Sequence, residues 1–265
     1  VTIYAPANCR YLQVLLYFGR MKIAIVAGGV PTTTFIDAQV NAMAEAGVDM
    51  IVIGKKSGTL HYHQNVRTLI IPKAMPAQLV FCASQLIQCR FKYVSAIYRH
   101  TKSFKHFFYD LLFYLPILNA KADKVHIQWA TFLHGKELLL DLLGDKIVLS
   151  LRVSHINSTP LVNTAVRDTY VKLFPRIKYF HAVSDAIAAE AMKYGANATA
   201  IETIYSFVND GLLQKEIKPK TGQRTLKIIS IGRFYWMKGY EYALDAMAML
   251  KAKGVPFHYT LVAQG

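Results

Sequence analysis

One stretch near the end of the chain combines residue types that suit a diphosphate. In SIGRFYWMKGYEYALDAM, residues 230–247, an apolar strand ends at Gly232 and Arg233, and Lys238 and Gly239 open the next helix. Arg233 offers a forked cation, Lys238 offers a point charge, and a helix N-terminus offers free backbone N–H groups. The pattern predicts a diphosphate site made by these four residues. The alternative is a loop whose two cations only face water.

A second group of chemically useful side chains follows another predicted strand. In SLRVSHINSTP, residues 150–160, Arg152 and His155 come at the end of an apolar run. Ligands of open α/β sheets bind beyond the carboxyl ends of the strands, so an arginine and a histidine grouped there favour a catalytic role. The alternative is a structural role for the histidine.

A glycine pair ends the first predicted strand. KIAIVAGG, residues 22–29, has the pattern of a buried strand, and a ligand can approach the backbone closely at Gly28 and Gly29 because they lack side chains. The spacing in AGGVPT is not the G-x-G-x-x-G of dinucleotide-binding loops. The pair therefore predicts either a substrate loop or a tight turn without a ligand.

Three other histidines and one serine receive structural interpretations. His61 and His63 have the spacing of metal ligands, but no set of cysteines or carboxylates lies near them, so a solvated loop is favoured and no metal site is expected. His181, inside the strand pattern YFHAVS, is expected to be buried. Ser184 is expected to cap the following helix, because nothing adjacent would activate it as a nucleophile.

These candidates are positioned by strands that alternate with helices. A helical pattern over 32–47 follows the first strand, and further helical patterns separate later apolar runs. The order predicts an α/β fold with a doubly wound, parallel, Rossmann-like sheet. The other strands are expected within 50–54, 67–72, 123–130, 145–155, 176–184 and 198–208.

The chain is expected to contain one full domain and part of another. The last residues, 226–265, repeat the strand, helix, strand pattern, and the polar, basic segment before them has the composition of a linker. We expect a first domain over 21–210, a linker over 211–225 and the start of a second domain over 226–265. Residues 1–20 are interpreted as an extension outside the fold, because MKIAIVAGG has the pattern of a first core strand.

Composition limits the possible partners. Among 265 residues, 53% are hydrophobic, which is enough for a sizeable core, and no apolar run approaches the ~20 residues of a membrane span. The three cysteines lack C-x-x-C spacing, which favours a reducing compartment such as the cytoplasm. A net charge of +15 suits anionic partners: nucleic acid, acidic membrane or phosphorylated small molecules.

Residues 77–118 are basic, aromatic and helical in pattern. One or two amphipathic helices that cover the sheet would explain them, and so would a surface that faces an anionic membrane or an acceptor. The cations of this segment are Arg90, Lys92, Arg99, Lys102 and Lys105, and the aromatic residues include Phe91, Tyr93, Tyr98, Phe104, Phe107 and Phe108.

The ordered set of these motifs resembles a known family. From about Met21 to Gly265, the chain is similar to nucleotide-sugar-dependent glycosyltransferases with two facing Rossmann-like domains, the GT-B architecture. The resemblance is to the retaining group related to bacterial exopolysaccharide and lipopolysaccharide glycosyltransferases. Its pieces occur in family order: TTTFIDAQVNAMAEAG, KVHIQWA, SLRVSHIN, FHAVSDAIAAEAMKYGA, IYSFVNDGLL and SIGRFYWMKGYEYALDAMAML.

The resemblance implies a function and roles for the candidates. A sugar would move from a nucleotide-diphosphate sugar, a co-substrate rather than a cofactor, to a glycan or lipid-linked acceptor. Arg233 and Lys238 would hold the donor diphosphate, and Gly28 and Gly29 would lie near the transferred sugar and the acceptor. The protein would be cytoplasmic, with a possible peripheral position on the inner face of the membrane.

The sequence departs from the family pattern in three places. RVSHIN replaces the commoner His-Gly-x-Asp, so either Arg152 or His155 would stand where the family has a histidine near the donor sugar. Ala263 replaces the first glycine of a Gly-x-Gly strand end. The family's paired donor-binding glutamates would follow Gly265, so the chain is interpreted as C-terminally truncated and inactive by itself.

Other functions stay open at this point. One alternative is another two-Rossmann sugar-nucleotide enzyme, such as an epimerase. A second is a catalytically silent homologue that acts as a scaffold. The positive charge alone would also suit a nucleic-acid binder, but no recognition motif supports one, so no nucleic-acid partner is expected.

Overall fold

The computed structural model describes residues 21–101, 103–206 and 225–264. The predicted extension over 1–20 lies outside these residues, and so does the predicted linker over 211–225 except for its last residue. The chain divides into two units, Val1–Ser206 and Phe207–Gly265, and each is described by itself. None of the helices in the described ranges is long and apolar enough to cross a membrane.

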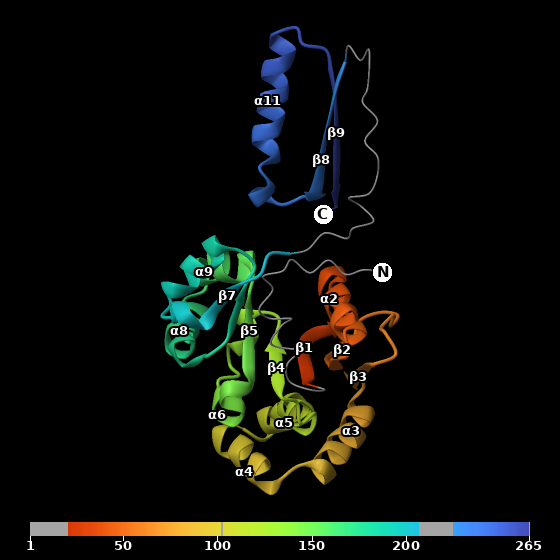
Figure 1. Ribbon diagram of the computed structural model, residues 1–265, viewed down its shortest axis with the longest axis vertical. Helices are drawn as coiled ribbons and strands as arrows, with labels where there is room; N and C mark the ends of the chain where they lie inside the picture. Colours follow the sequence, from red (N-terminus) through yellow and green to blue (C-terminus); the bar gives the residue numbers. More distant parts are fainter. Residues whose placement is uncertain (1–20, 102, 207–224, 265) are drawn as a thin grey trace. The chain divides into compact units, whose positions relative to one another are not determined.

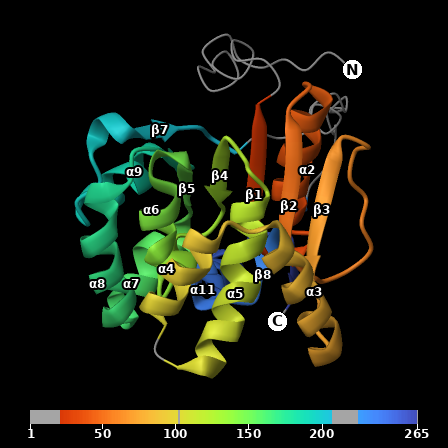
Figure 2. The ribbon, with the colours of Figure 1, turned by 90° about the horizontal axis from the view of Figure 1, so that it is seen from below.

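The first unit contains a sheet of seven parallel strands (Figures 1 and 2). Their order in the sheet is β3-β2-β1-β4-β5-β6-β7, so the chain order reverses between β1 and β4. The α/β, doubly wound fold predicted from the sequence is confirmed. The strands are β1 Lys22–Val30, β2 Asp49–Lys56, β3 Val66–Ile71, β4 Lys124–Ile127, β5 Ile147–Leu151, β6 Phe180–Ala182 and β7 Ile201–Thr203.

Helices connect the strands in the order that the sequence pattern requires. The α-helices are α2 Thr34–Glu45, α3 Met75–Gln88, α4 Phe91–His100, α5 Phe104–Asn119, α6 Leu138–Leu143, α7 Thr159–Val162, α8 Thr164–Leu173 and α9 Asp185–Met192. Short 3-10 turns are η1 Ala130–Leu133, η2 Gly144–Lys146, η4 Phe174–Arg176 and η5 Ala198–Ala200, and a π-turn, η3, spans Ser154–Ser158. The hydroxyl of Ser184 accepts the N–H of Ile187, which confirms the predicted cap of α9.

Two hydrophobic clusters form the core, one on each face of the sheet. Helix α2 covers one face of β1 and β2, and α3 and α5 lie on the opposite side (Figure 1). Successive residues of a strand face opposite sides, so β1 contributes to both clusters. The α2 side contains Ile23, Ile25, Ile36, Val40, Met43 and Val52; the other contains Ala24, Val26, Ile53, Leu115, Ile127, Leu149, Tyr170 and Phe174.

The basic, aromatic segment folds into three helices, not one or two. Arg90 and Ser103 have extended backbone conformations and are the N-caps of α4 and α5. The segment is therefore divided into separate helices at these two residues, although its periodicity is also compatible with fewer, longer helices. Figure 2 shows α3, α4 and α5 grouped on one side of the sheet, and α3 and α4 both contact α5.

The glycine pair lies inside β1, not in a loop after it. The pairing of β1 with β2 shifts register between Val26 and Gly29 and then continues to the end of the strand. A Cβ atom at Gly29 would lie 2.9 Å from Cβ of Ser57, and one at Gly28 would lie 3.3 Å from Cζ of Phe132. The expectation that the two glycines form a loop or turn after the strand is therefore wrong, because Gly29 pairs with Lys55 of β2 and Gly28 lies in the register shift inside β1. Their role beside a substrate stays a prediction.

Gly54 of β2 provides a stability prediction. A Cβ atom there would lie 2.6 Å from the carbonyl oxygen of Ala27 and 2.9 Å from Cγ2 of Val30, at the register shift of β1. Backbone cannot move aside as a flexible side chain can. We expect Gly54→Ala to lower the free energy of unfolding of the first unit by about 2 kcal/mol.

The measurement is urea unfolding followed by the fluorescence of Trp129, in a Trp236→Phe background that silences the other tryptophan. Gly58→Ala is the matched control, because its added Cβ would lie 3.5 Å from Pro31, an ordinary contact. Equal midpoints for the two variants would contradict the predicted clash.

The second unit is a small parallel sheet with one helix. It contains β8 Leu226–Arg233, the 3-10 turn η6 Trp236–Lys238, α11 Tyr240–Ala252 and β9 Phe257–Gln264. Strands β8 and β9 pair in parallel along their whole length. Gly239 has φ +63°, a left-handed conformation that glycine adopts without strain, and it connects η6 to α11.

Candidate functional site

The candidate site of the first unit lies where the strand order reverses. In an open α/β sheet, the loops diverge at such a switch point and leave a crevice at the carboxyl ends of the strands. Gln128 and Trp129 follow β4 directly, and Arg152 follows β5. The side chains of Gln128, Trp129 and Arg152 therefore all belong to residues at the carboxyl ends of β4 and β5.

Arg152 is a half-buried cation that no carboxylate among the described residues neutralises. Its Nη2 donates to Oε1 of Gln128 at 2.8 Å, and its guanidinium carbon lies 4.5 Å from the ring centre of Phe35 and 5.4 Å from that of Trp129. Among the described residues, no carboxylate lies within ion-pair distance of it, and its buried Nε has no hydrogen-bond partner. Burial lowers its pKa to about 10, so the group stays charged at neutral pH. A charged guanidinium in this environment is suited to bind an anion or a ligand with strong hydrogen-bond acceptors.

His155 lies beside Arg152 in the π-turn η3. Its Nδ1 is 2.8 Å from Oγ1 of Thr131, and its ring centre is 4.8 Å from that of Trp129. The hydroxyl of Tyr170 donates to the backbone carbonyl of His155 at 3.0 Å and fixes the turn. Burial, followed by the charge of Arg152, lowers the pKa of His155, which favours the neutral ring. The structure thus brings the two predicted residues together around one indole.

A chain of hydrogen bonds connects Arg152 to the backbone carbonyl of Ile204, and its donors and acceptors can be assigned from that carbonyl backwards. A carbonyl oxygen only accepts, so Nε2 of His181 donates to the carbonyl of Ile204 at 3.1 Å. Nδ1 of the neutral ring must then accept from the hydroxyl of Ser150 at 2.9 Å. The hydroxyl in turn accepts from Nε2 of His126 at 2.7 Å.

The amide of Gln128 completes this line. Nδ1 of His126 is left as an acceptor, and Nε2 of Gln128 lies 3.4 Å from it, so the Oε1 atom of Gln128 is turned toward Arg152. Both histidines are neutral, with a single tautomer each. We name the members the Arg152 relay: Arg152, Gln128, His126, Ser150, His181 and the carbonyl of Ile204.

Sheet geometry explains the relay. Residues two apart in a strand point to the same face, which places His126 with Gln128 and Ser150 with Arg152. Strand register places Ser150 beside His181. His181 is buried in β6, as expected from the sequence, but its part in the relay was not foreseen.

The buried histidines predict a pH dependence of stability. Burial, with smaller contributions from His181 and Arg152, lowers the pKa of His126 to about 3 from an ordinary 6.5. Between pH 6.5 and pH 3, the imidazole of His126 is therefore protonated in the unfolded chain but neutral in the folded chain. The folded state has its full stability with respect to this group above pH 6.5 and loses stability as the pH falls toward 3. Stability should fall by up to about 1.4 kcal/mol per pH unit from this residue.

Thermal melts between about pH 7 and pH 5 check this, because carboxylates stay largely ionised there. His126→Asn should flatten the slope. His61→Asn, at an exposed position, should leave it unchanged. A variant at position 126 with the wild-type slope would contradict the neutral, buried imidazole.

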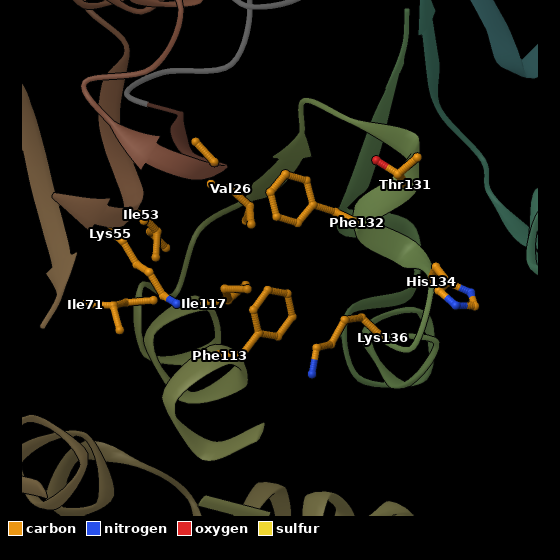
Figure 3. Close-up of a pocket in the computed structure, with 13 residues that line it drawn as sticks. Val26, Ile53, Lys55, Ile71, Phe113, Ile117, Thr131, Phe132, His134 and Lys136 are labelled. Atoms are coloured by element: carbon orange, nitrogen blue, oxygen red, sulfur yellow. The ribbon is translucent and has the colours of Figure 1, made fainter. Parts of the chain in front are cut away.

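A pocket of about 360 Å³ opens near the same edge, on the face covered by α5. Figure 3 shows Phe113 and Phe132 along its wall, with the ammonium groups of Lys55 and Lys136 entering from opposite sides. Lys136 also pairs with Asp110 at 2.6 Å. Thr131, the partner of His155, lines the pocket too, and so does Gly28. The pocket therefore combines apolar walls with cations beside the candidate catalytic residues.

In the second unit, Lys238 packs against the end of the strand that carries Arg233. A Cβ atom at Gly232 would lie 3.6 and 3.7 Å from Cε and Cδ of Lys238, so the lysine stem lies over Gly232, and Arg233 is the next residue of β8. Both side chains are exposed, and neither forms an ion pair with any carboxylate in the part of the chain that the structure describes. Gly239 precedes α11, whose first backbone N–H groups are free to bind an anion.

Several residues of the first site were not predicted from the sequence. Gln128 and Trp129 follow the strand pattern KVHIQWA, so the rule that selected Arg152 would have found them. Phe35 and Phe113 lie on helices and Lys136 lies between η1 and α6, and none of the three carries a local signal. Within the described residues, no group of three or more His, Cys, Asp or Glu side chains is placed to hold a metal ion.

Comparison with known proteins supports the fold. No protein-family model and no curated protein sequence matches the chain. Sucrose-phosphate synthase from Thermosynechococcus elongatus matches with a TM-score of 0.56 and 13% identity, over 91% of this chain and 62% of that chain. The apo form of the lipopolysaccharide outer core galactosyltransferase WaaB matches at 0.51 and 11%, over 91% and 68%. Anabaena Alr3699/HepE in complex with UDP matches at 0.51 and 12%, over 91% and 69%.

These identities establish a common fold and nothing finer. The chain spans between 62% and 69% of the length of the three solved chains. One of these three proteins is a lipopolysaccharide galactosyltransferase and another was solved in complex with UDP, so the resemblance predicted from the sequence is confirmed at the level of fold.

Proposed function

We propose that the complete protein transfers a sugar from a nucleotide-diphosphate sugar to a glycan or lipid-linked acceptor, with retention of configuration, in the synthesis of cell-envelope polysaccharide. The observation that carries the proposal is the turn between β8 and α11. There Arg233 ends β8 and Lys238 precedes Gly239, the N-cap of a 13-residue helix, and neither cation has a carboxylate partner among the described residues. Two cations and free N–H groups suit a pyrophosphate.

The chemistry assigns the two cations to the leaving group. The acceptor oxygen forms a bond to the anomeric carbon on the face from which the diphosphate departs, and the bond from that carbon to the diphosphate breaks. The electron pair stays on the diphosphate, which also takes the acceptor proton. Arg233 and Lys238 oppose the negative charge as it grows, so they stabilise the transition state more than the bound donor.

The first unit supplies the acceptor side in this proposal. His155, held through Nδ1 by Thr131, presents Nε2 to a sugar hydroxyl, and Arg152 binds an acceptor or donor oxygen. The neighbouring pocket offers Phe113 to an apolar face, and its two lysines, Lys55 and Lys136, suit a phosphate such as a lipid-linked acceptor carries. Nucleotide sugars and such acceptors meet at the cytoplasmic face of a membrane, where we place the protein.

The test is turnover by the complete protein with a panel of UDP-, GDP- and dTDP-sugars and short glycan or polyprenyl-phosphate acceptors. Release of nucleoside diphosphate that depends on the acceptor, with an unchanged anomeric configuration of the product by NMR, would support the proposal. Rearrangement of the nucleotide sugar without an acceptor would instead identify an epimerase. Failure to bind any nucleoside diphosphate by calorimetry would overturn the donor site itself.

A further inference from the structure

A long part of the first unit contains no acidic residue. Between Asp49 and Asp110, residues 50–109 include nine lysines and arginines and no aspartate or glutamate, whereas the whole chain has 16 acidic residues. Asp110 itself pairs with Lys136 and accepts a hydrogen bond from Thr101, so it does not offset the charge. The end of this segment forms α3, α4 and the start of α5.

Helix α4 lies on the surface with a buried side and an exposed side. Ile97 is fully buried, and Tyr93 and Val94 pack against the core. Phe91 and Tyr98 are exposed and seven residues apart, so they lie two turns apart on the same face. Lys92 and Arg99 repeat that spacing one position later and are also exposed. An aromatic row and a cationic row therefore run side by side along the helix.

The turns at both ends of α4 continue this composition. At its start, Phe91 follows Arg90 and is 84% exposed, and Ile87, near the end of α3, is 87% exposed. After α4, Phe104 is 87% exposed and precedes Lys105. We name these residues the α4 surface: Ile87, Arg90, Phe91, Lys92, Tyr98, Arg99, Phe104 and Lys105.

The cations of the α4 surface are not neutralised within the described residues. None of Arg90, Lys92, Arg99 and Lys105 forms an ion pair there. Lys92 lies 5.1 Å from the ring centre of Tyr93, and Arg99 donates to the hydroxyl of Ser95 at 3.1 Å. Exposed aromatic rings beside unpaired cations are the composition of a membrane-interface helix.

We propose that the α4 surface docks on an anionic lipid bilayer, with Phe91, Tyr98 and Phe104 in the headgroup region and the cations against lipid phosphates. The inference goes beyond the proposed transfer reaction and does not rest on it, because it uses none of the site residues. Each cation near an anionic surface contributes about 1 kcal/mol to the binding free energy, which is a factor of about five in the partition coefficient. The contributions of the four cations multiply in the partition coefficient.

Charge and side-chain type favour a bilayer over other partners. A second copy of the same surface would bring like charges together. A single-stranded nucleic acid would stack on the aromatic rings, but it gains nothing from the exposed aliphatic side chains of this region, Leu79, Val80 and Ile87, whereas hydrocarbon does.

Co-sedimentation with vesicles tests the proposal. The whole protein is mixed with vesicles of phosphatidylcholine alone or of phosphatidylcholine with phosphatidylglycerol. We expect binding to the anionic vesicles only, weakened by added salt. The triple variant Lys92→Gln, Arg99→Gln, Lys105→Gln should lower the partition coefficient about a hundredfold. The double variant Phe91→Ser, Phe104→Ser should lower it with the charge unchanged.

The matched control removes the same charge elsewhere: Lys121→Gln, Lys172→Gln, Lys193→Gln, all at exposed positions. Its binding should fall far less than that of the first triple variant. Circular dichroism spectra equal to that of the wild type establish that the variants are folded. Equal wild-type binding to neutral and anionic vesicles, or equal losses in the two triple variants, would overturn the proposal. So would binding to a single-stranded oligonucleotide that the same substitutions abolish while no protein sediments with vesicles.

Discussion

Replacing Arg233 or Lys238 by alanine in the complete protein is expected to lower the rate of sugar transfer about a hundredfold or more. Each substitution removes a charge-assisted contact that strengthens as the bond to the diphosphate breaks. The loss should therefore appear in kcat as well as in donor affinity. Steady-state kinetics with varied nucleotide sugar, together with calorimetric binding of the free nucleoside diphosphate, measures both.

Two further variants sharpen this test. Arg233→Lys should recover only part of the activity, because an ammonium group cannot make the two-pronged contact of a guanidinium. Lys227→Ala, at an exposed position of the same strand β8, removes the same charge away from the turn and should have little effect. Near-normal diphosphate binding and turnover in folded Arg233→Ala and Lys238→Ala proteins would show that the turn is only a loop.

Arg152→Met is expected to separate stability from activity. Methionine keeps apolar volume between the rings of Phe35 and Trp129 but removes a half-buried charge that no carboxylate among the described residues offsets. We expect the free energy of unfolding to stay the same or to rise by about 1 kcal/mol. Transfer should fall about a hundredfold if Arg152 binds a substrate oxygen.

Kinetics and urea unfolding of the same preparation measure the two effects. Arg152→Lys should not restore activity, because an ammonium group does not stack on Phe35 and reach Gln128 as the planar guanidinium does. Gln128→Ala, which removes the amide that holds the guanidinium, should give a smaller loss of transfer than Arg152→Met. A variant that loses stability and activity in parallel would indicate a structural role for Arg152 instead.

The fold class was predictable because its signals are local. Apolar runs such as KIAIV and KIVLSL need burial on both faces, and the polar or glycine-containing segments between them end each strand. Alternation of such runs with helical periodicity allows few arrangements other than a parallel sheet. The cap at Ser184 was predictable for the same reason, since its partner, Ile187, is three residues away.

The candidate cations were predictable in position but not in surroundings. Arg152 and Arg233 end or follow apolar runs, and parallel strands bring such positions to one edge of their sheet. Nothing local shows that Phe35, from another element, lies over the guanidinium, or that Gln128 accepts from it. Those contacts depend on the packing of α2 and on strand order.

By itself, the sequence determined the alternation of strands with helices and which strand ends carry charge, because backbone preferences and hydrophobic periodicity act over a few residues. Only the tertiary structure decided that Gly28 and Gly29 stay in β1, because pairing with β2 resumes after the register shift. The Arg152 relay also depends on the tertiary structure. Its members His126, Ser150 and His181 lie far apart in the sequence, and the register of three neighbouring strands brings them into hydrogen-bond contact. Side-chain partners across strands are a property of the assembled sheet, and no local pattern encodes them.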